Sequence, residues 1–371
     1  MNSVLQSAFP PRRPILTRHV FTCQPGWEDI LLAELRGVFP GAREELIAHG
    51  WVATEPSSAA DAGVPCVTFA GQCLPDAVPI SASSISQWAA QTTEWMVESL
   101  GGHDGRWRLH VFNVPVPAGP VGPARCRLIE AAIAETLRKK RRRLWRALVA
   151  EPNAPATSDE ALVQVGLVTA GTGYGSCCLP DRWSAMRRCA SRFAGGTVTI
   201  PPDRRAPSRA FAKLAEVEIR LGRRIAADET CIDLGSSPGS WAWLALARGA
   251  RVTAVDRSPL RADLVRHARM TFIRGDAFRY RPAAPVDWLL CDVIAFPSRT
   301  IELLRIWLTQ RWCRWFCVTI KFRGADEYGC LQEIKSWLAA RGVEFFVRRL
   351  TSNKNEAVVF GCVDSSIQAR L

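Results

Sequence analysis

Four ionisable residues in the carboxyl-terminal half of the sequence could together move a proton. Asp292 and Lys321 close the apolar runs WLLCDV and CVTIKF, and open α/β sheets place their chemistry at such strand ends. Lys213 lies in the helical segment PSRAFAKLAEVE, and Glu356 lies in SNKNEAVVF. Each residue alone is also explained by a surface salt bridge. Two lysines and two carboxylates delivered to one cleft predict a site that can give or take a proton.

A lysine must lose its own proton before it can act as a general base. The reference pKa of lysine is about 10.4, so burial or a second cation must lower it. Lys213 is the candidate second cation for Lys321. Asp292 and Glu356 oppose this lowering, and we expect them to orient the lysines and the substrate hydroxyl. We expect Lys321 to be the base, while the sequence leaves open which of the four residues accepts the proton.

A glycine-containing run precedes three of these residues and predicts a cofactor pocket. The run DLGSSPGSW follows a short apolar strand and opens a helix, where α/β sheets bind nucleotides. Gly235 and Gly239 let the backbone turn sharply, and Pro238 fixes one φ angle. The run has neither the GxGxxG pattern nor the lysine of a P-loop, so neither a pyrophosphate nor a triphosphate is its natural ligand. The alternative is a purely structural turn. The expected lining residues are Asp233, Gly235, Ser236, Ser237, Pro238, Gly239, Ser240 and Trp241.

Two further carboxylates follow the next two predicted strands. Asp256 ends RVTAVD, where a carboxylate can accept hydrogen bonds from both hydroxyls of an unphosphorylated ribose. Asp276, in RGDAF, could meet the exocyclic amine of adenine, although either aspartate could instead cap the turn that follows it. S-adenosylmethionine fits this site better than NAD because it has no pyrophosphate. Its sulfonium cation also tolerates nearby carboxylates, for which Asp233 and Asp292 are candidates.

The elements that must position these residues alternate along the chain. The pattern predicts helices at 208–221, 239–248, 298–311 and 327–341, and strands at 230–234, 251–255, 271–273, 286–291, 314–321, 343–349 and 356–362. Strands separated by helices favour a doubly wound, mainly parallel sheet.

The amino-terminal half reads as smaller α+β units. A strand from His19 and a turn precede a helix whose apolar stripe is Ile30, Leu31, Leu35 and Val38. Strand-like runs follow at 50–53, 65–70, 106–114 and 161–170, with helices at 84–99 and 125–150. The composition breaks at Gly195 and Gly196. We therefore expect three domains, at residues 1–100, 101–194 and 195–371.

Composition narrows the class of protein. Of the 371 residues 48% are hydrophobic and 22% are charged, which describes a soluble globular protein. No run approaches the roughly 18 apolar residues of a membrane span, and the first twenty residues lack a secretory pattern. We therefore expect a cytoplasmic protein. The 13 cysteines are scattered through apolar stretches without any CxxC, which favours buried thiols over disulfides or a metal site.

Positive charge predicts a polyanionic partner. The formal net charge is +13, and the basic residues are grouped in two places. A basic helix face can be merely solvated, but two groups beside a cofactor site favour RNA. The first group is Arg138, Lys139, Lys140, Arg141, Arg142 and Arg143, and the second is Arg187, Arg188, Arg192, Arg204, Arg205 and Arg209.

The DLGSSPGSW run and the Lys-Asp-Lys-Glu order resemble the cofactor loop and catalytic tetrad of the FtsJ-like RNA ribose 2′-O-methyltransferases, over residues 203–362. CQPGWEDILLAEL at 23–35 is similar to the opening of the ribosomal RNA large subunit methyltransferase M family. The resemblance implies a Rossmann-like methyltransferase domain that uses S-adenosylmethionine, preceded by ferredoxin-like and THUMP-like domains. It also implies a cytidine of 23S rRNA as the target. Two segments depart from the family, the Arg-rich stretch 179–200 and the short loop 322–329.

Three alternatives stay open at this point. The chain could methylate another RNA, or it could be a non-catalytic RNA-binding assembly factor that retains the fold. It could also be a small-molecule methyltransferase or a nucleotide-dependent oxidoreductase whose basic groups are incidental. The sequence does not give the oligomeric state.

Overall fold

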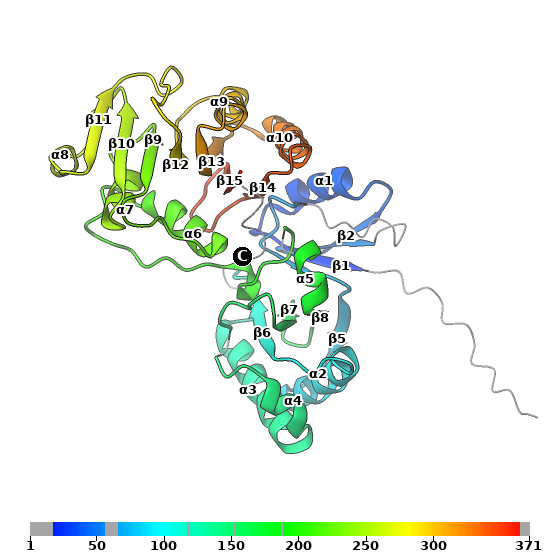
Figure 1. Cartoon of the computed structure of the whole chain (residues 1–371). Coiled ribbons are helices and arrows are strands. Elements are labelled where there is room, and N and C mark those ends of the chain that lie inside the picture. The colour runs from blue at the N-terminus through cyan, green and yellow to red at the C-terminus, as the bar shows by residue number, and fades with distance from the viewer. Residues whose placement is uncertain are drawn as a thin grey trace, which may run out of the picture.

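The computed structural model describes residues 18–55, 66–116, 119, 121–151, 153–186 and 188–363. These residues form a seven-stranded sheet and two four-stranded sheets. Figure 1 shows each sheet with its own helices, and the three units meet near the short linker that leads to the carboxyl-terminal unit.

The amino-terminal unit is an antiparallel sheet covered by one helix. It contains β1 (His19–Thr22), α1 (Glu28–Val38), β2 (Arg43–Ala48), β3 (Trp51–Glu55) and β4 (Gln72–Leu74), in the sheet order β2-β3-β1-β4. Helix α1 buries Leu31, Leu32 and Leu35, while Ile30 and Val38 of the predicted stripe are only partly buried.

The predicted strand at 65–70 is wrong for the residues described there. Residues 66–70 form no strand, and the pairing with β1 is made by Gln72–Leu74 instead. The segment is apolar because Cys66, Val67 and Phe69 are buried in the core that this unit shares with the carboxyl-terminal unit.

The second unit carries most of the basic helix surface. It contains β5 (Val78–Ser81), α2 (Ile85–Ser99), β6 (Trp107–Asn113), α3 (Pro123–Lys140), α4 (Arg142–Ala147), β7 (Ala161–Leu167) and β8 (Thr172–Cys178), in the sheet order β5-β8-β7-β6. The first two sheets therefore divide between Leu74 and Val78, since β5 pairs with β8 and α2 packs on α3. This differs from the predicted boundary near residue 100. The single helix predicted over 125–150 is broken at Arg141, whose φ of −138° and ψ of 57° are not helical.

The carboxyl-terminal unit follows α5 (Pro180–Met186) and a single 3-10 turn at Ala194–Gly196. Its elements are α6 (Phe211–Leu221), β9 (Thr230–Leu234), α7 (Ser240–Ala247), β10 (Arg251–Asp256), α8 (Ala262–Val265), β11 (Met270–Arg274), β12 (Val286–Cys291), α9 (Pro297–Thr309), β13 (Cys313–Lys321), a 3-10 turn (Ala325–Gly329), α10 (Cys330–Ala339), β14 (Glu344–Arg348) and β15 (Glu356–Cys362). The strand order is β11-β10-β9-β12-β13-β15-β14. β15 runs antiparallel to both of its neighbours, β13 and β14, and the other pairs of strands are parallel. The predicted doubly wound, mainly parallel sheet is confirmed.

Helices cover both faces of this sheet. Trp288 and Leu290 of β12 join the cluster of Leu214 from α6 and Trp241 from α7. Leu289 and Cys291 of the same strand join the cluster on the other face, with α9 and α10. Alternate residues of β12 therefore face opposite helix layers, as the two-residue period of a strand requires. Because Trp288–Cys291 are buried on both faces, this part of the strand reads as a continuous apolar run.

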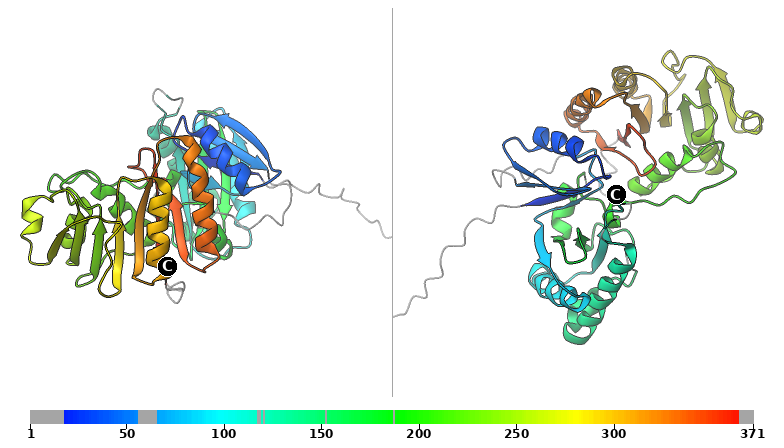
Figure 2. Two further views of the ribbon diagram at one scale, coloured as in Figure 1. Left: turned by 90° about the horizontal axis from the view of Figure 1, so that it is seen from above. Right: turned by 180° about the vertical axis from the view of Figure 1, so that it is seen from behind.

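The amino-terminal and carboxyl-terminal units share one core. Figure 2 shows α1 beside α10 from two directions. Glu34 of α1 pairs with Lys335 of α10 at 2.6 Å, and both side chains are at least nine-tenths buried. The Trp27, Phe69 and Tyr328 rings lie within 6.3 Å of one another, centroid to centroid. A buried ion pair and an aromatic cluster at one boundary fix how the two units sit.

Candidate active site

The four predicted catalytic residues converge at the carboxyl-terminal edge of the seven-stranded sheet. Lys213 Nζ lies 2.8 Å from Glu356 Oε1 and 3.2 Å from both carboxylate oxygens of Asp292. Lys321 Nζ lies 3.1 Å from Asp292 Oδ1 and donates to the Asp292 backbone carbonyl at 2.7 Å. Lys321 and Glu356 also face each other across the β13–β15 ladder. Both lysines therefore contact one carboxylate.

The two lysines have different environments. Burial lowers the pKa of Lys213, but the Asp292 and Glu356 carboxylates raise it by more, so its pKa lies above the usual range. Lys213 therefore stays charged and fixes both carboxylates. The Lys321 side chain is 24% exposed, against 10% for Lys213. Lys321 is thus the lysine that a ligand can reach.

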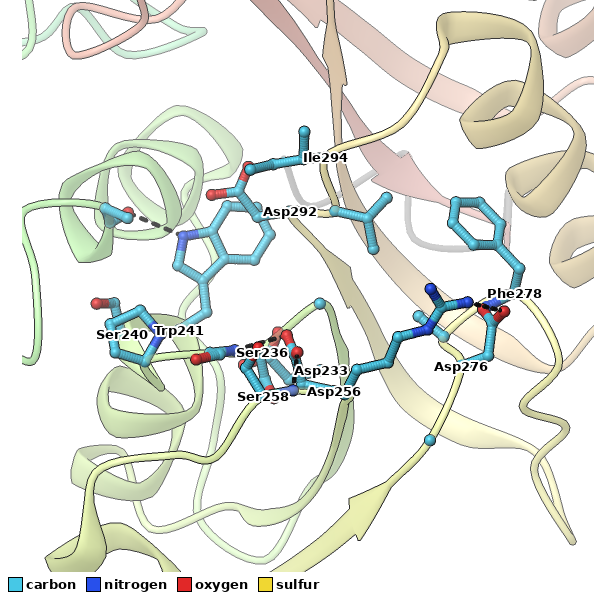
Figure 3. Close-up of a pocket in the computed structure, with 18 of the residues that line it drawn as sticks. Asp233, Ser236, Ser240, Trp241, Asp256, Ser258, Asp276, Phe278, Asp292 and Ile294 are labelled. Atoms are coloured by element: carbon cyan, nitrogen blue, oxygen red, sulfur yellow. Dashed lines mark hydrogen bonds and ion pairs between the residues drawn. The ribbon is translucent and has the colours of Figure 1, made fainter.

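A cavity of about 480 Å³ opens at this edge and includes most of the predicted cofactor residues. Its volume lies within the usual range for small-molecule sites. Asp292 and Lys321 lie in its lining, whereas Lys213 and Glu356 contact Asp292 or each other outside it. In Figure 3, Asp292 and Trp241 lie at one end of the cavity, while Asp276 and Phe278 lie at the other. The lining from the predicted run is Asp233, Gly235, Ser236, Ser237, Pro238, Ser240 and Trp241.

Glycine is required at position 235 for two reasons. Its φ is +74°, and a Cβ atom there would lie 2.5 Å from Val293 Cγ1. Gly239, also with positive φ, precedes α7 and packs against Leu264 rather than lining the cavity. The Trp241 indole N–H donates to the Ala210 carbonyl at 2.8 Å, and this ties the loop to the segment before α6.

Asp233 is buried beneath the loop. One carboxylate oxygen accepts a hydrogen bond from the Ala242 N–H at 3.0 Å. Burial, with additions from Asp292 and Asp256, raises the pKa of Asp233 to about 8, and the Ala242 hydrogen bond opposes this. Asp233 is therefore mainly protonated, and so neutral, at neutral pH. A cation bound nearby would favour its ionised form.

Asp256 organises the backbone around the middle of the cavity. Its two oxygens accept hydrogen bonds from the Ser237 N–H at 2.9 Å and the Ser258 N–H at 2.8 Å. Each carboxylate oxygen can accept a second hydrogen bond. The capping role considered from the sequence is thus present, and it leaves room for ligand hydroxyls.

Asp276 lies at the far end of the cavity. The Phe278 N–H donates to one of its oxygens, and Arg257 pairs with the other at 2.5 Å. The Phe278 hydrogen bond, followed by the Arg257 and Arg299 charges, holds the pKa of Asp276 below its usual range despite partial burial. Asp276 is therefore an anion that can accept hydrogen bonds from an amine.

Sequence reasoning missed several lining residues. Arg257, Phe278, Ile294 and Arg299 also line the cavity. Each lies within a few residues of a predicted aspartate or on the following helix, so the strand-end rule could have been extended to them. The Arg299 guanidinium stacks on Phe278, 3.9 Å from the ring centroid.

The two basic groups differ in what the structure does with them. Residues 138–143 are all exposed on α3 and α4. Within this group Arg138 and Lys139 pair with Glu135, and Arg143 pairs with Asp104. Arg204, Arg205 and Arg209 are exposed beside the cofactor loop. Arg188 and Arg192 instead stack on Phe345 and Phe193, and Arg187 lies outside the described residues.

The described part of the chain holds no group of three or more His, Cys, Asp or Glu side chains that could bind a metal ion. All 13 cysteines are free thiols, and all except Cys177 and Cys330 are buried, so the predicted buried thiols are confirmed. None of the described helices combines the length and apolar character needed to cross a membrane.

Comparison with known proteins places this site in a family. Residues 206–318 match the FtsJ-like methyltransferase family. The carboxyl-terminal unit is an FtsJ-like methyltransferase domain. This range includes two of the four tetrad residues, Lys213 and Asp292, and the whole cofactor loop, and it ends within β13, before Lys321.

Curated relatives extend the similarity beyond the domain name. The chain is 38% identical over 151 residues to "Ribosomal RNA large subunit methyltransferase M" of Stutzerimonas stutzeri, covering 38% of this chain and 43% of that protein. It is 34% identical over 171 residues to the protein of the same name from Azotobacter vinelandii, covering 43% and 48%. The chain thus spans less than half the length of these relatives. The predicted resemblance to this family is confirmed.

Among solved structures, TrmN from Thermus thermophilus aligns with 93% of this chain and 99% of its own, at 16% identity and a TM-score of 0.34. A likeness this weak carries no argument about function.

Proposed function

We propose that this protein is an S-adenosylmethionine-dependent RNA ribose 2′-O-methyltransferase that acts on large-subunit ribosomal RNA. One observation carries the proposal. Asp292 contacts both lysines of the tetrad at the end of a cavity whose other carboxylates, Asp256 and Asp276, are spaced along its length.

The cavity residues fit S-adenosylmethionine chemically. The Ser236 hydroxyl is buried in the lining and has no partner among the described residues. Gly235 lets the loop backbone lie directly against Val293, since a Cβ atom at position 235 would come within 2.5 Å of Val293 Cγ1. Asp256 would accept from the ribose hydroxyls, Asp276 from the adenine amine, and Asp233 and Asp292 would lie near the cationic portion.

When bound, S-adenosylmethionine supplies a methyl group activated by its sulfonium. The tetrad then has to orient the acceptor hydroxyl and remove its proton. In its neutral amine form, Lys321 Nζ is the group at the cavity surface that can accept this proton. Asp292 holds Lys321 in place through both its side chain and its backbone carbonyl. Lys213 remains charged and keeps Asp292 and Glu356 fixed while Lys321 changes its protonation state.

The RNA partner rests on charge and on the relatives. Relatives of this chain are named as large-subunit ribosomal RNA methyltransferases, and the family resemblance implies a cytidine of 23S rRNA. We propose that the unit containing α3 and α4 is the THUMP-like RNA-binding domain, with Arg141 and Arg142 among its phosphate contacts. Arg204 and Arg209 would then contact RNA beside the cofactor loop.

The test is transfer of labelled methyl from S-adenosylmethionine to protein-free 23S rRNA that lacks this modification. Wild-type protein should label a ribose, and Lys321→Ala should bind the cofactor but transfer no label. Lys354→Ala, an exposed lysine outside the cavity lining, is the matched control and should transfer normally. Cofactor binding without transfer by the wild type would instead indicate another RNA, a small molecule or a non-catalytic binding protein.

A further inference from the structure

An exposed apolar loop lies directly beside the proposed proton acceptor. Ile294 is 91% exposed and Phe296 is 53% exposed, the two residues following Asp292 by two and four positions. Large apolar side chains are otherwise mostly buried in the described residues. Ile294 also lines the cavity that contains Lys321. Exposed apolar side chains next to a site mark a surface that a ligand covers.

An arginine completes this surface. The Arg323 guanidinium lies 4.1 Å from the centroid of the Phe296 ring. Arg323 follows Lys321 by two residues, just as Ile294 follows Asp292. The two loops that carry the catalytic pair therefore also carry a flat, cationic and apolar surface at the cavity mouth.

The loop holding Arg323 is fixed rather than free. The Arg323 N–H donates to Glu327 at 2.7 Å. The neighbouring Phe322 N–H donates to the Asn355 carbonyl at 3.0 Å, and the Tyr328 hydroxyl donates to the Asn355 side chain at 2.6 Å. Arg323 is thus held where its guanidinium covers Phe296.

We propose that Ile294, Phe296 and Arg323 form the platform on which the base of the methyl-accepting nucleotide stacks. This inference rests on the proposed function. Single-stranded RNA is recognised by stacking bases on aromatic rings and arginine planes. A ribose whose 2′-hydroxyl reaches Lys321 carries its base only one glycosidic bond away, and this platform is the exposed flat surface beside Lys321. The cofactor's adenine does not need it, because Asp276 and Phe278 lie at the opposite end of the cavity.

The first test separates binding from chemistry. Base–aromatic stacking lost on alanine substitution corresponds to about a 5- to 150-fold change in an equilibrium constant. Phe296→Ala and Phe296→Leu should raise the KM for RNA within this range, with the alanine variant worse, while kcat changes less and the Kd for S-adenosylmethionine stays constant. Ile294→Ala should act in the same direction. Leu46→Ala removes an aliphatic side chain of β2 that is 57% exposed, close to the 53% of Phe296. This control should change none of these values.

The second test does not depend on methyl transfer. Single-stranded RNA carrying 5-iodouridine at the acceptor position is irradiated with the full-length protein and S-adenosylhomocysteine, and the cross-linked peptide is identified. Cross-linking at Phe296, lost in Phe296→Leu and kept in Leu46→Ala, supports the platform even if the wild type transfers no methyl group to rRNA, in which case only the proposed function fails. Active wild type with an unchanged KM in Phe296→Ala, or cross-links confined to α3 and α4, would overturn the platform while leaving the proposed function intact.

Discussion

Replacing Asp233 by asparagine is expected to remove a pH dependence from the stability of this protein. The pKa of Asp233 is about 8 in the folded protein, whereas an unfolded aspartate titrates near 3.9. Between these values the folded protein holds one proton that the unfolded chain has released. The stabilising contribution of the protonated carboxyl is therefore complete below about pH 4 and is lost as the pH rises through 8.

The magnitude follows from this difference. Each pH unit in that window changes the free energy of unfolding by up to about 1.4 kcal/mol. From pH 5.5 to 7.5 the wild type should lose up to about 2.7 kcal/mol relative to Asp233→Asn, since the amide keeps the shape and still accepts from the Ala242 N–H but does not titrate.

Urea unfolding of both proteins at pH 5.5, 6.5 and 7.5 measures this difference directly. All other titrating groups are shared by the two proteins and cancel. Unfolding free energies that run parallel over this range would show that Asp233 is ionised in the folded state and would refute its assignment as a protonated buried acid. A difference that grows with pH in favour of the wild type would reverse the sign and refute it equally.

Three further results are expected. Gly235→Ala should lower the free energy of unfolding by about 1–3 kcal/mol more than Gly342→Ala does. Both glycines have positive φ, but only at Gly235 would an added Cβ lie within 3 Å of Val293. Equal losses in urea unfolding would contradict this close approach. Lys213→Met removes the lysine that pairs with Glu356 and leaves Asp292 paired with Lys321 alone. It should lower the free energy of unfolding by up to about 3 kcal/mol, and adding Glu356→Gln should restore part of this loss. No recovery in the double variant would contradict the ion-pair account. Replacing Arg141, Arg142 and Arg143 by Gln should weaken RNA binding. The slope of the logarithm of the binding constant against the logarithm of the salt concentration should flatten by up to about 2–3, as measured by filter binding from about 50 to 200 mM salt. An unchanged slope would show that these three arginines do not contact the RNA.

The carboxyl-terminal fold was largely predictable because its signals are local. β9, β12 and β15 have the bounds predicted from their mainly apolar runs, since strands buried on both faces consist largely of apolar residues. The tetrad was predictable for a related reason: carboxyl ends of parallel strands meet at one edge. The register that sets Lys321 opposite Glu356 depends on β15 running antiparallel, which no local pattern encodes.

The amino-terminal half was less predictable because its apolar segments serve two cores. Residues 66–70 read as a strand but pack against the carboxyl-terminal unit. β5 is a short strand containing Pro79 with mostly exposed side chains, so neither alternation nor apolar content marks it. The ion pairs around Asp276 were also beyond the sequence, because Arg257 and Arg299 come from different elements and meet only in the folded sheet.

The shared cores have a geometric consequence. One apolar cluster joins the amino-terminal unit to the carboxyl-terminal unit, and another joins Val20 and Leu74 to Phe112 of the second unit. The basic surface of α3 and α4 is therefore held at a fixed distance from Lys321, because the three units are joined by shared cores and not only by linkers. On the proposed function, this fixed distance selects the target ribose, since the ribose must reach Lys321 while a distant stretch of the RNA backbone contacts α3 and α4. A short oligonucleotide that contains only the target nucleotide and its neighbours would contact the site at Lys321 but not the basic surface of α3 and α4.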